Sequence, residues 1–210
     1  MTLKEAEVRR LLDRYLVEIV EAYGLCPWAR SARTGGEISV GIVWGERPAI
    51  DSWVTTAREL VARPTTRVAM VLAPELKLTP NELRSDREQV GRKLDTCGVA
   101  DFHPDVELDA ATASRSVPFV RRSPDPLMQF VPLSILDVIR RQTAVTLSDQ
   151  LKALGGIAYN NPDDIGDEIL AKNYATVLAS RAEMTRLLND IAADRRRSYP
   201  GVGIALNTIR

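Results

Sequence analysis

Helical and extended patterns alternate along the first half of the chain, and this alternation limits the fold more than any other feature of the sequence. Helical spacing of apolar residues and helix start signals predict helices over residues 3–23, 50–62 and 79–95. Short apolar or β-branched runs predict strands over residues 38–44, 67–72 and 98–102. Strands that alternate with helices favour a largely parallel sheet with helices packed on it. We therefore expect an α/β fold with three or more mostly parallel strands.

Several of these segments carry clear local signals. Thr79 is a good N-cap residue, Pro80 suits the first helical position, and Glu82 is acidic in the first turn. The run 67–72, RVAMVL, is apolar without alternation, which is typical of a strand covered on both faces. Gly24 is a stop signal for the first helix.

The C-terminal third has mainly helical patterns. Helices are predicted over residues 133–142, 147–154 and 163–196, and the tail after residue 198 holds two glycines and a proline. No internal repeat, low-complexity tract or linker pattern divides the sequence. The 210 residues are therefore predicted to form a single α/β domain, with residues 133–210 as a mainly helical extension.

Residues 103–132 form a segment rich in proline and arginine. Its five prolines are Pro104, Pro118, Pro124, Pro126 and Pro132. Proline breaks helices and is excluded from the middle of a sheet, so this segment is predicted to contain neither a regular helix nor a central strand. Long loops inside a compact domain are often functional, and we expect this segment to be a functional loop.

The charge balance limits the classes of partner. Lys plus Arg and Asp plus Glu both number 28, so the net charge is zero, whereas nucleic-acid binders need a basic excess. No apolar stretch approaches the roughly 20 residues that span a bilayer, and the charged N-terminus does not have the apolar core of a signal peptide. We expect a cytoplasmic protein that binds a small-molecule substrate, and neither nucleic acid nor a membrane. The sequence leaves homo-oligomer formation open.

His103 is the only histidine of the chain, and it directly follows the predicted strand 98–102. In open α/β sheets, ligands collect at the carboxyl ends of the strands. A histidine there can be a general base, a metal ligand or an axial ligand to heme iron, and a hydrogen bond to a loop carbonyl is the commoner alternative. Most zinc and non-heme iron sites need further His or Cys ligands, whereas heme needs one protein ligand. His103 is therefore the first candidate for catalysis or iron ligation.

Three arginines in the proline-rich segment, Arg115, Arg121 and Arg122, are candidates for binding an anion. A guanidinium group recognises carboxylates and phosphates with two parallel hydrogen bonds. Heme propionates, a substrate carboxylate or a phosphate would all suit such a set. The alternative is an ordinary solvated surface loop.

The two cysteines, Cys26 and Cys97, form neither a disulfide framework nor a zinc-ligand spacing. Cys26 could be a heme thiolate, a reactive thiol or a small buried residue that packs a turn. Its neighbours Leu25 and Trp28 are apolar and would raise the pKa of the thiol. We therefore predict a packing role for Cys26, and a core position for Cys97.

Three short segments resemble, in the same order, the marker segments of a bacterial family of unknown function. They are residues 25–29 (LCPWA), 102–105 (FHPD) and 122–126 (RSPDP). Family members usually carry L-C-P-F-A, F-H-P-D-Y and N-R-S-P-Y-P-M-L-H. The chain departs from this pattern at Trp28, Val106, Arg121, Asp125 and Gln129. The resemblance spans about residues 10–140, and Gln129 stands where the family has its last histidine.

A more distant resemblance adds chemistry. The order of a cysteine turn, a His-Pro pair after a strand and an Arg-rich loop is similar to that in bacterial heme-dependent guanidino-group N-hydroxylases. The resemblance implies heme b as cofactor and His103 as its axial ligand. It implies further pocket or propionate contacts for Arg115, Arg121, Arg122, Phe102 and Trp28, with Cys26 beside the pocket.

Three functional hypotheses follow. The leading one is a heme-binding, oxygen-activating oxidoreductase, a monooxygenase of the oxygenase or N-hydroxylase type, acting on a small, polar, amino-acid-like substrate. The second is a non-heme enzyme with His103 as base, an arginine clamp for an anionic substrate, and Cys26 as a nucleophile. The third is a non-catalytic domain that binds heme or a partner protein.

Overall fold

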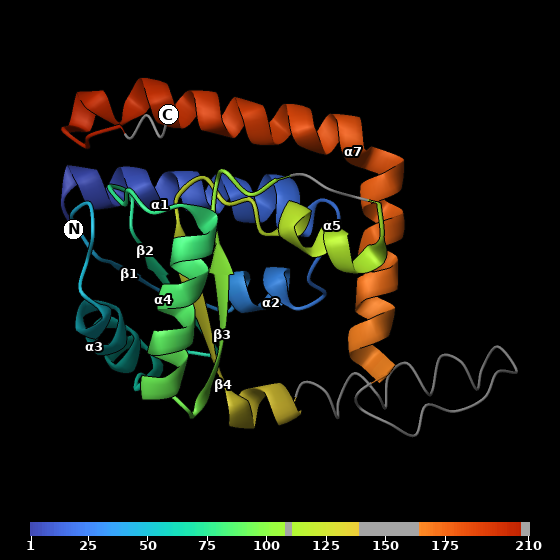
Figure 1. Ribbon diagram of the computed structural model, residues 1–210, viewed down its shortest axis with the longest axis horizontal. Helices are drawn as coiled ribbons and strands as arrows, with labels where there is room; N and C mark the ends of the chain where they lie inside the picture. Colours follow the sequence, from blue (N-terminus) through green and yellow to red (C-terminus); the bar gives the residue numbers. More distant parts are fainter. Residues whose placement is uncertain (108–110, 139–163, 207–210) are drawn as a thin grey trace, which may run out of the picture.

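The computed structural model describes residues 1–107, 111–138 and 164–206, and it contains one four-stranded sheet within these ranges (Figure 1). The strands are β1 (Ile38–Ile42), β2 (Val68–Leu72), β3 (Cys97–Phe102) and β4 (Leu127–Pro132). Their order across the sheet is β1-β2-β4-β3. The first three strands begin and end within two residues of the strands predicted from the sequence.

The sheet is mixed, which confirms the α/β class and corrects the expected strand directions. β1 and β2 are parallel, with Ile38 opposite Val68. β4 is antiparallel to both β2 and β3, so it is inserted between two strands that run in the same direction. Only one of the three pairings between the described strands is therefore parallel, and the prediction of a mostly parallel sheet was wrong in this respect.

The source of this error is the proline-rich segment, which contains both a helix and a central strand. Helix α5 spans Ala113–Val120 and includes Pro118 within it. Pro126 comes just before β4 and Pro132 is its last residue, so the interior of this strand is free of proline. The prolines therefore border β4, and they do not prevent it from pairing on both edges. Residues 108–110 of the segment lie outside the described ranges.

The N-terminal helix forms as predicted, and its second part is a π-helix. Helix α1 (Leu3–Tyr15) starts at a capping box made by Thr2 and Glu5, and it continues as a π-helix, η1 (Leu16–Glu21). Gly24 adopts φ +60, a left-handed conformation that favours glycine and ends the helical path. A short helix, α2 (Ala29–Thr34), follows in a segment for which the sequence predicts neither a helix nor a strand.

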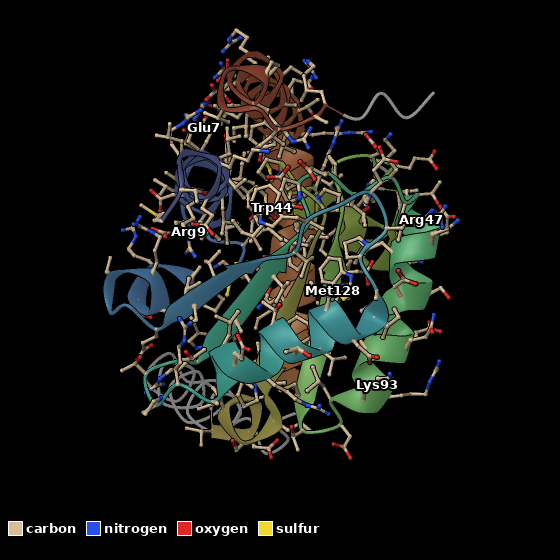
Figure 2. All side chains as sticks on the ribbon, turned by 90° about the vertical axis from the view of Figure 1, so that its left-hand side faces the viewer. Glu7, Arg9, Trp44, Arg47, Lys93 and Met128 are labelled. Carbon is tan, nitrogen blue, oxygen red and sulfur yellow. The ribbon has the colours of Figure 1, made fainter. Side chains whose placement is uncertain are left out.

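Helices cover both faces of the sheet (Figures 1 and 2). On one face, α3 (Ile50–Val61) and α4 (Pro80–Lys93) form a core with alternate strand residues, among them Val71 and the fully buried Met128. On the other face, α1, η1 and α7 (Asp164–Ser198) form a second core with Met70. As the apolar run predicts, all of β2 except its first residue is buried.

Helix α7 confirms the predicted long C-terminal helix, and its second half lies along α1 (Figure 1). Arg14 of α1 forms ion pairs with Asp194 at 2.6 Å and with Asp190 at 2.9 Å, and these residues join the two helices. A 3₁₀ turn, η2 (Pro200–Val202), follows α7. Residues 133–138 are helical, as expected, whereas the helix predicted over 147–154 lies outside the described residues.

None of the helices in the described ranges combines the length and the apolar character needed to cross a membrane.

Candidate functional site

The residues predicted to form one site line two different cavities. Cys26, Trp28, Phe102 and Arg121 line a cavity on the sheet face that also carries α1, and we name it the apolar cavity. His103 and Arg122, together with Pro104 and the C-terminal half of α7, line a second one, which we name the polar cavity. The side chain of the remaining candidate, Arg115 in α5, lies outside the described part of the structure.

Strand geometry explains this division. Successive side chains of an extended backbone point to opposite sides, so Phe102 at the end of β3 and the next residue, His103, enter different cavities. Arg121 and Arg122 divide in the same way. The backbone N–H of His103 donates to the carbonyl of Arg121 at 3.1 Å, which holds the two segments together between the cavities.

The apolar cavity has a volume of about 260 Å³. Its floor is the sheet face, with Met70 and Leu127, and its cover comes from η1, α2 and the turn between them, with Leu16 and Trp28. The π-helical form of η1 is notable here because single π-turns occur often at functional sites.

Arg121 brings a charge into this apolar surrounding. Its guanidinium lies over the ring of Phe102 at 5.9 Å, and it has no hydrogen bond or ion pair with any residue of the described ranges. Asp101, a described acidic group that acts on the charge of Arg121, is itself paired with Arg87 and Arg84. Burial lowers the pKa of Arg121 below its ordinary value, although Asp101 raises it in part. The apolar cavity therefore holds a partly desolvated cation that has no counterion among the residues the structure describes.

Further polar groups line the apolar cavity. The hydroxyl of Tyr15 donates to the carbonyl of Val120 at 2.7 Å, so it is already satisfied. Burial raises the pKa of the Cys26 thiol, in agreement with its apolar neighbours, and this supports a protonated packing residue. The amide of Gln129 enters from β4, at the position where the resembling family has its histidine.

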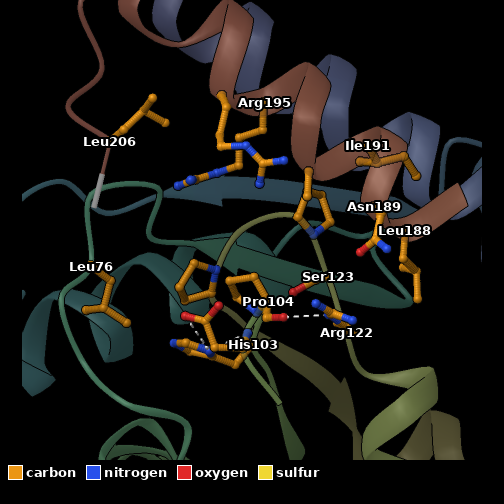
Figure 3. A pocket seen from close by; sticks show the side chains of 15 residues that line it. Leu76, His103, Pro104, Arg122, Ser123, Leu188, Asn189, Ile191, Arg195 and Leu206 are labelled. Atoms are coloured by element: carbon orange, nitrogen blue, oxygen red, sulfur yellow. Dashed lines mark hydrogen bonds and ion pairs between the residues drawn. The ribbon is translucent and has the colours of Figure 1, made fainter. Parts of the chain in front are cut away.

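The polar cavity is about 330 Å³ in volume and lies beyond the carboxyl ends of β2 and β3 (Figure 3). Leu76 comes from the segment after β2, and residues 103–105 come directly after β3. The segment 122–126 before β4 and the last turns of α7 complete the wall. This position agrees with the expectation that ligands collect at this edge of an α/β sheet.

His103 is buried in the wall of this cavity, with 1% of its surface exposed, and both of its ring nitrogens are bonded. Its Nε2 lies 2.9 Å from the carbonyl of Leu78, and its Nδ1 accepts the backbone N–H of Asp105 at 3.1 Å. This pattern assigns the ring proton to Nε2. Burial lowers the pKa of His103, so the ring is neutral at pH 7.

The geometry of His103 therefore corresponds to the structural alternative, a histidine bonded to a loop carbonyl. An axial ligand or a general base needs a free lone pair on one ring nitrogen, and neither nitrogen has one here. The heme and base hypotheses gain no support from this arrangement and stay predictions. Within the described residues, no three or more His, Cys, Asp or Glu side chains gather in a way that could hold a metal ion.

A buried ionic network beside the polar cavity has no counterpart in the sequence analysis. Asp125 is completely buried, accepts a hydrogen bond from Arg195 Nε at 2.7 Å, and accepts another from the hydroxyl of Tyr199. Arg195 also donates to the carbonyl of Pro74 at 2.8 Å and lies 4.6 Å over the Tyr199 ring. Burial raises the pKa of Asp125, while Arg195 and Tyr199 lower it. The network joins the segment before β4 to the end of α7.

Comparison of the chain with protein-family models, with curated proteins and with solved structures gives no match. The two resemblances noted in the sequence stay predictions, and the geometry of the two cavities is the basis for assigning a function.

Proposed function

We propose that the protein binds a small organic acid in the apolar cavity, with the carboxylate on Arg121 and the hydrocarbon or aromatic part against the apolar wall. The observation that carries this proposal is the guanidinium of Arg121, which lies in an apolar cavity without an acidic partner among the described residues.

A ligand carboxylate would satisfy a group that the described part of the protein leaves unsatisfied. Removing a charge from water is unfavourable unless it is paired and hydrogen-bonded. Arg121 is partly removed from water, but it is neither paired nor hydrogen-bonded among the described residues. Its guanidinium lies over the Phe102 ring instead. A guanidinium fork binds a carboxylate with two hydrogen bonds, which are stronger in such a surrounding than in water.

The size and polarity of the cavity limit the ligand. Ligand pockets span roughly 300 to 1,000 Å³, so a cavity of about 260 Å³ accepts only a small molecule. Gln129, Cys26 and the indole N–H of Trp28 are further polar groups of the wall, and the rest of it is mainly apolar. An aromatic acid with one ring, or a short-chain acid, suits this combination.

The division between the cavities bears on the heme hypothesis. His103 lines one cavity and the proposed pocket residues Trp28 and Phe102 line the other, which favours the organic-acid proposal over the heme hypothesis. The absorption spectrum of protein expressed with a heme precursor tests that hypothesis directly. A Soret band that is lost in His103→Ala would overturn the organic-acid proposal in favour of heme.

Calorimetric titration with benzoate, phenylacetate and hexanoate, and with the matching neutral amides, tests the proposal. We expect at least one acid to bind and its amide to bind more weakly. Arg121→Gln removes charge-assisted hydrogen bonds of roughly 1.5–3 kcal/mol each and should weaken acid binding about ten- to a hundredfold. Arg63→Gln, an exposed arginine outside both cavities, is the control. Equal affinity for acid and amide, or for the parent and Arg121→Gln, would contradict the proposal.

A further inference from the structure

The polar cavity has properties of a binding site of its own. It is larger than the apolar cavity, at about 330 Å³, and its residues come from the middle and from the C-terminal end of the described chain. The cavity is lined by one acidic side chain, Asp105, and by three arginines, Arg122, Arg195 and Arg196. Because Arg195 is neutralised by the buried Asp125, two guanidinium groups face one carboxylate. The cavity therefore has an excess of positive charge.

Arg122 is oriented by the protein and is not neutralised by any carboxylate of the described residues. Its Nε donates to the carbonyl of Pro104 at 2.7 Å, which fixes the plane of the guanidinium (Figure 3). Its terminal nitrogens have no hydrogen bond or ion pair to any described residue. A guanidinium held through Nε keeps its two terminal nitrogens for an incoming oxyanion.

Helix α7 brings further donors to the opposite wall. Asn189, Ala192 and Arg196 are three and four residues apart, so they lie on one side of the helix and all line the cavity. Arg196 is exposed, and like Arg122 it pairs with no carboxylate in the part of the chain that is described. Ala192, between the two polar residues, leaves space for a ligand.

The buried network keeps these two walls at a fixed distance. Asp125 belongs to the segment that follows Arg122, and Arg195 precedes Arg196 in α7. The ion pair and the Tyr199 hydrogen bond therefore connect the backbone segment that carries Arg122 with the helix end that carries Arg196. Such preorganisation lowers the entropic cost of binding an anion between the walls.

We propose that the polar cavity is a second binding site, for the phosphoryl or carboxylate group of a small ligand held between Arg122 and Arg196. Asn189 supplies an amide that can bond the same group or its neighbour. The volume exceeds that of a single oxyanion, so an organic part of the ligand occupies the space beside Leu76 and Leu206. The ring of His103, which is neutral, forms part of the wall.

Calorimetric titration of the full chain with phenyl phosphate, inorganic phosphate and succinate tests this proposal and distinguishes the two sources of the oxyanion. We expect phenyl phosphate or succinate to bind, with an affinity that falls as salt is added. Arg122→Gln and Arg196→Gln should each weaken binding at least tenfold. Arg197→Gln, an exposed neighbour that does not line the cavity, is the matched control.

Two results would overturn the proposal. One is that none of the three probes binds the parent protein, and the other is that the parent and both variants bind with equal affinity. Because Arg196 is exposed, Arg196→Gln retains its fold even if the loss of the Pro104 bond unfolds Arg122→Gln. Arg121→Gln separates this site from the organic-acid site, since it should weaken binding of the monocarboxylic acids about ten- to a hundredfold and leave phenyl phosphate binding unchanged.

Discussion

The two cavities share a stretch of backbone and differ in how they treat charge. In the apolar cavity a single guanidinium, that of Arg121, lies in a nearly apolar wall with only the Phe102 ring against it. In the polar cavity, the buried Arg195 is paired with Asp125 and bonds the carbonyl of Pro74, and Arg122 is held through one nitrogen. The difference teaches that burial alone does not identify a binding arginine. The absence of a partner among the described residues does.

This comparison assigns different roles to neighbouring residues. We expect Arg121 to lower the stability of ligand-free protein and to strengthen the proposed acid binding, because its charge is partly desolvated and has no ion-pair partner among the described residues. Arg122 contributes to the fold through the Pro104 carbonyl and still has donors for a ligand. Arg195 contributes to stability only, since all its contacts are within the protein.

The largest expected effect comes from the buried network. Asp125→Asn leaves the Arg195 cation buried without its counterion, and removing one partner of such a pair destabilises proteins by about 3–5 kcal/mol. Urea unfolding measures the change, with Asp105→Asn, an exposed carboxylate of the same cavity, as the control. The variant should keep acid binding in the apolar cavity while it is folded. An unfolding free energy equal to that of the parent would mean that the network does not hold the polar cavity together.

The next effect separates the neighbouring arginines by the sign of their stability change. Arg121→Leu should raise the unfolding free energy of ligand-free protein by about 0.5–2 kcal/mol, because it replaces an unpaired charge in an apolar wall, and it should abolish acid binding. Arg122→Leu removes the donor to Pro104 and should lower the unfolding free energy by about 0.5–1.5 kcal/mol. Denaturant curves without ligand measure both. Two changes of the same sign would remove the distinction between the cavities.

The sequence predicts the elements that depend on local signals and misses those that depend on distant partners. The Thr79 cap and the apolar run of β2 are local, and both lie where they are expected. Strand β4 pairs with segments before it in the chain, and its bordering prolines indicate a loop. Only its insertion into the sheet shows that the strand exists.

The candidate site illustrates the same limit. His103 is found from its position after a strand, but whether its ring nitrogens are free depends on Leu78, 25 residues away. Asp125 and Arg195 are 70 residues apart, and the run of three arginines at the end of α7 is already explained by the helix dipole. The sequence therefore names a few of the residues that line the cavities, and it does not show which of them meet.

A smaller effect depends on pH and concerns only the polar cavity. Burial lowers the pKa of His103 in the folded protein, whereas its unfolded value is about 6.5. The unfolded state therefore binds a proton first, so the stabilisation is complete above pH 6.5 and falls as the pH decreases toward the folded pKa. The Leu78 carbonyl, Asp105 and Asp101 raise this pKa, and Arg195 lowers it together with burial.

The measurement is the unfolding free energy of the parent and of His103→Gln between pH 7.5 and pH 5. We expect the parent to lose more stability over this range than the variant, because carboxylates such as Asp125 titrate in both proteins and cancel in the difference. Acid binding in the apolar cavity should be unaffected by the substitution. Parallel curves would show that His103 is protonated in the folded protein as easily as in the unfolded one.

The smallest effect uses the thiol of Cys26 as a reporter for the apolar cavity. Cys26 lines that cavity and not the polar one, and burial raises the pKa of its thiol, so its reaction with a neutral alkylating reagent at pH 7 should be slower than that of a free cysteine. An organic acid on Arg121 should slow it severalfold further, by covering the thiol, whereas phenyl phosphate should leave the rate unchanged. The other cysteine, Cys97, belongs to the core with α3 and α4. The substitution Cys97→Ala removes any reaction of the reagent with that thiol. Protection of Cys26 by phenyl phosphate, or an absence of protection by a bound acid, would show that the two ligands do not occupy separate cavities, and would contradict the division on which both proposals rest.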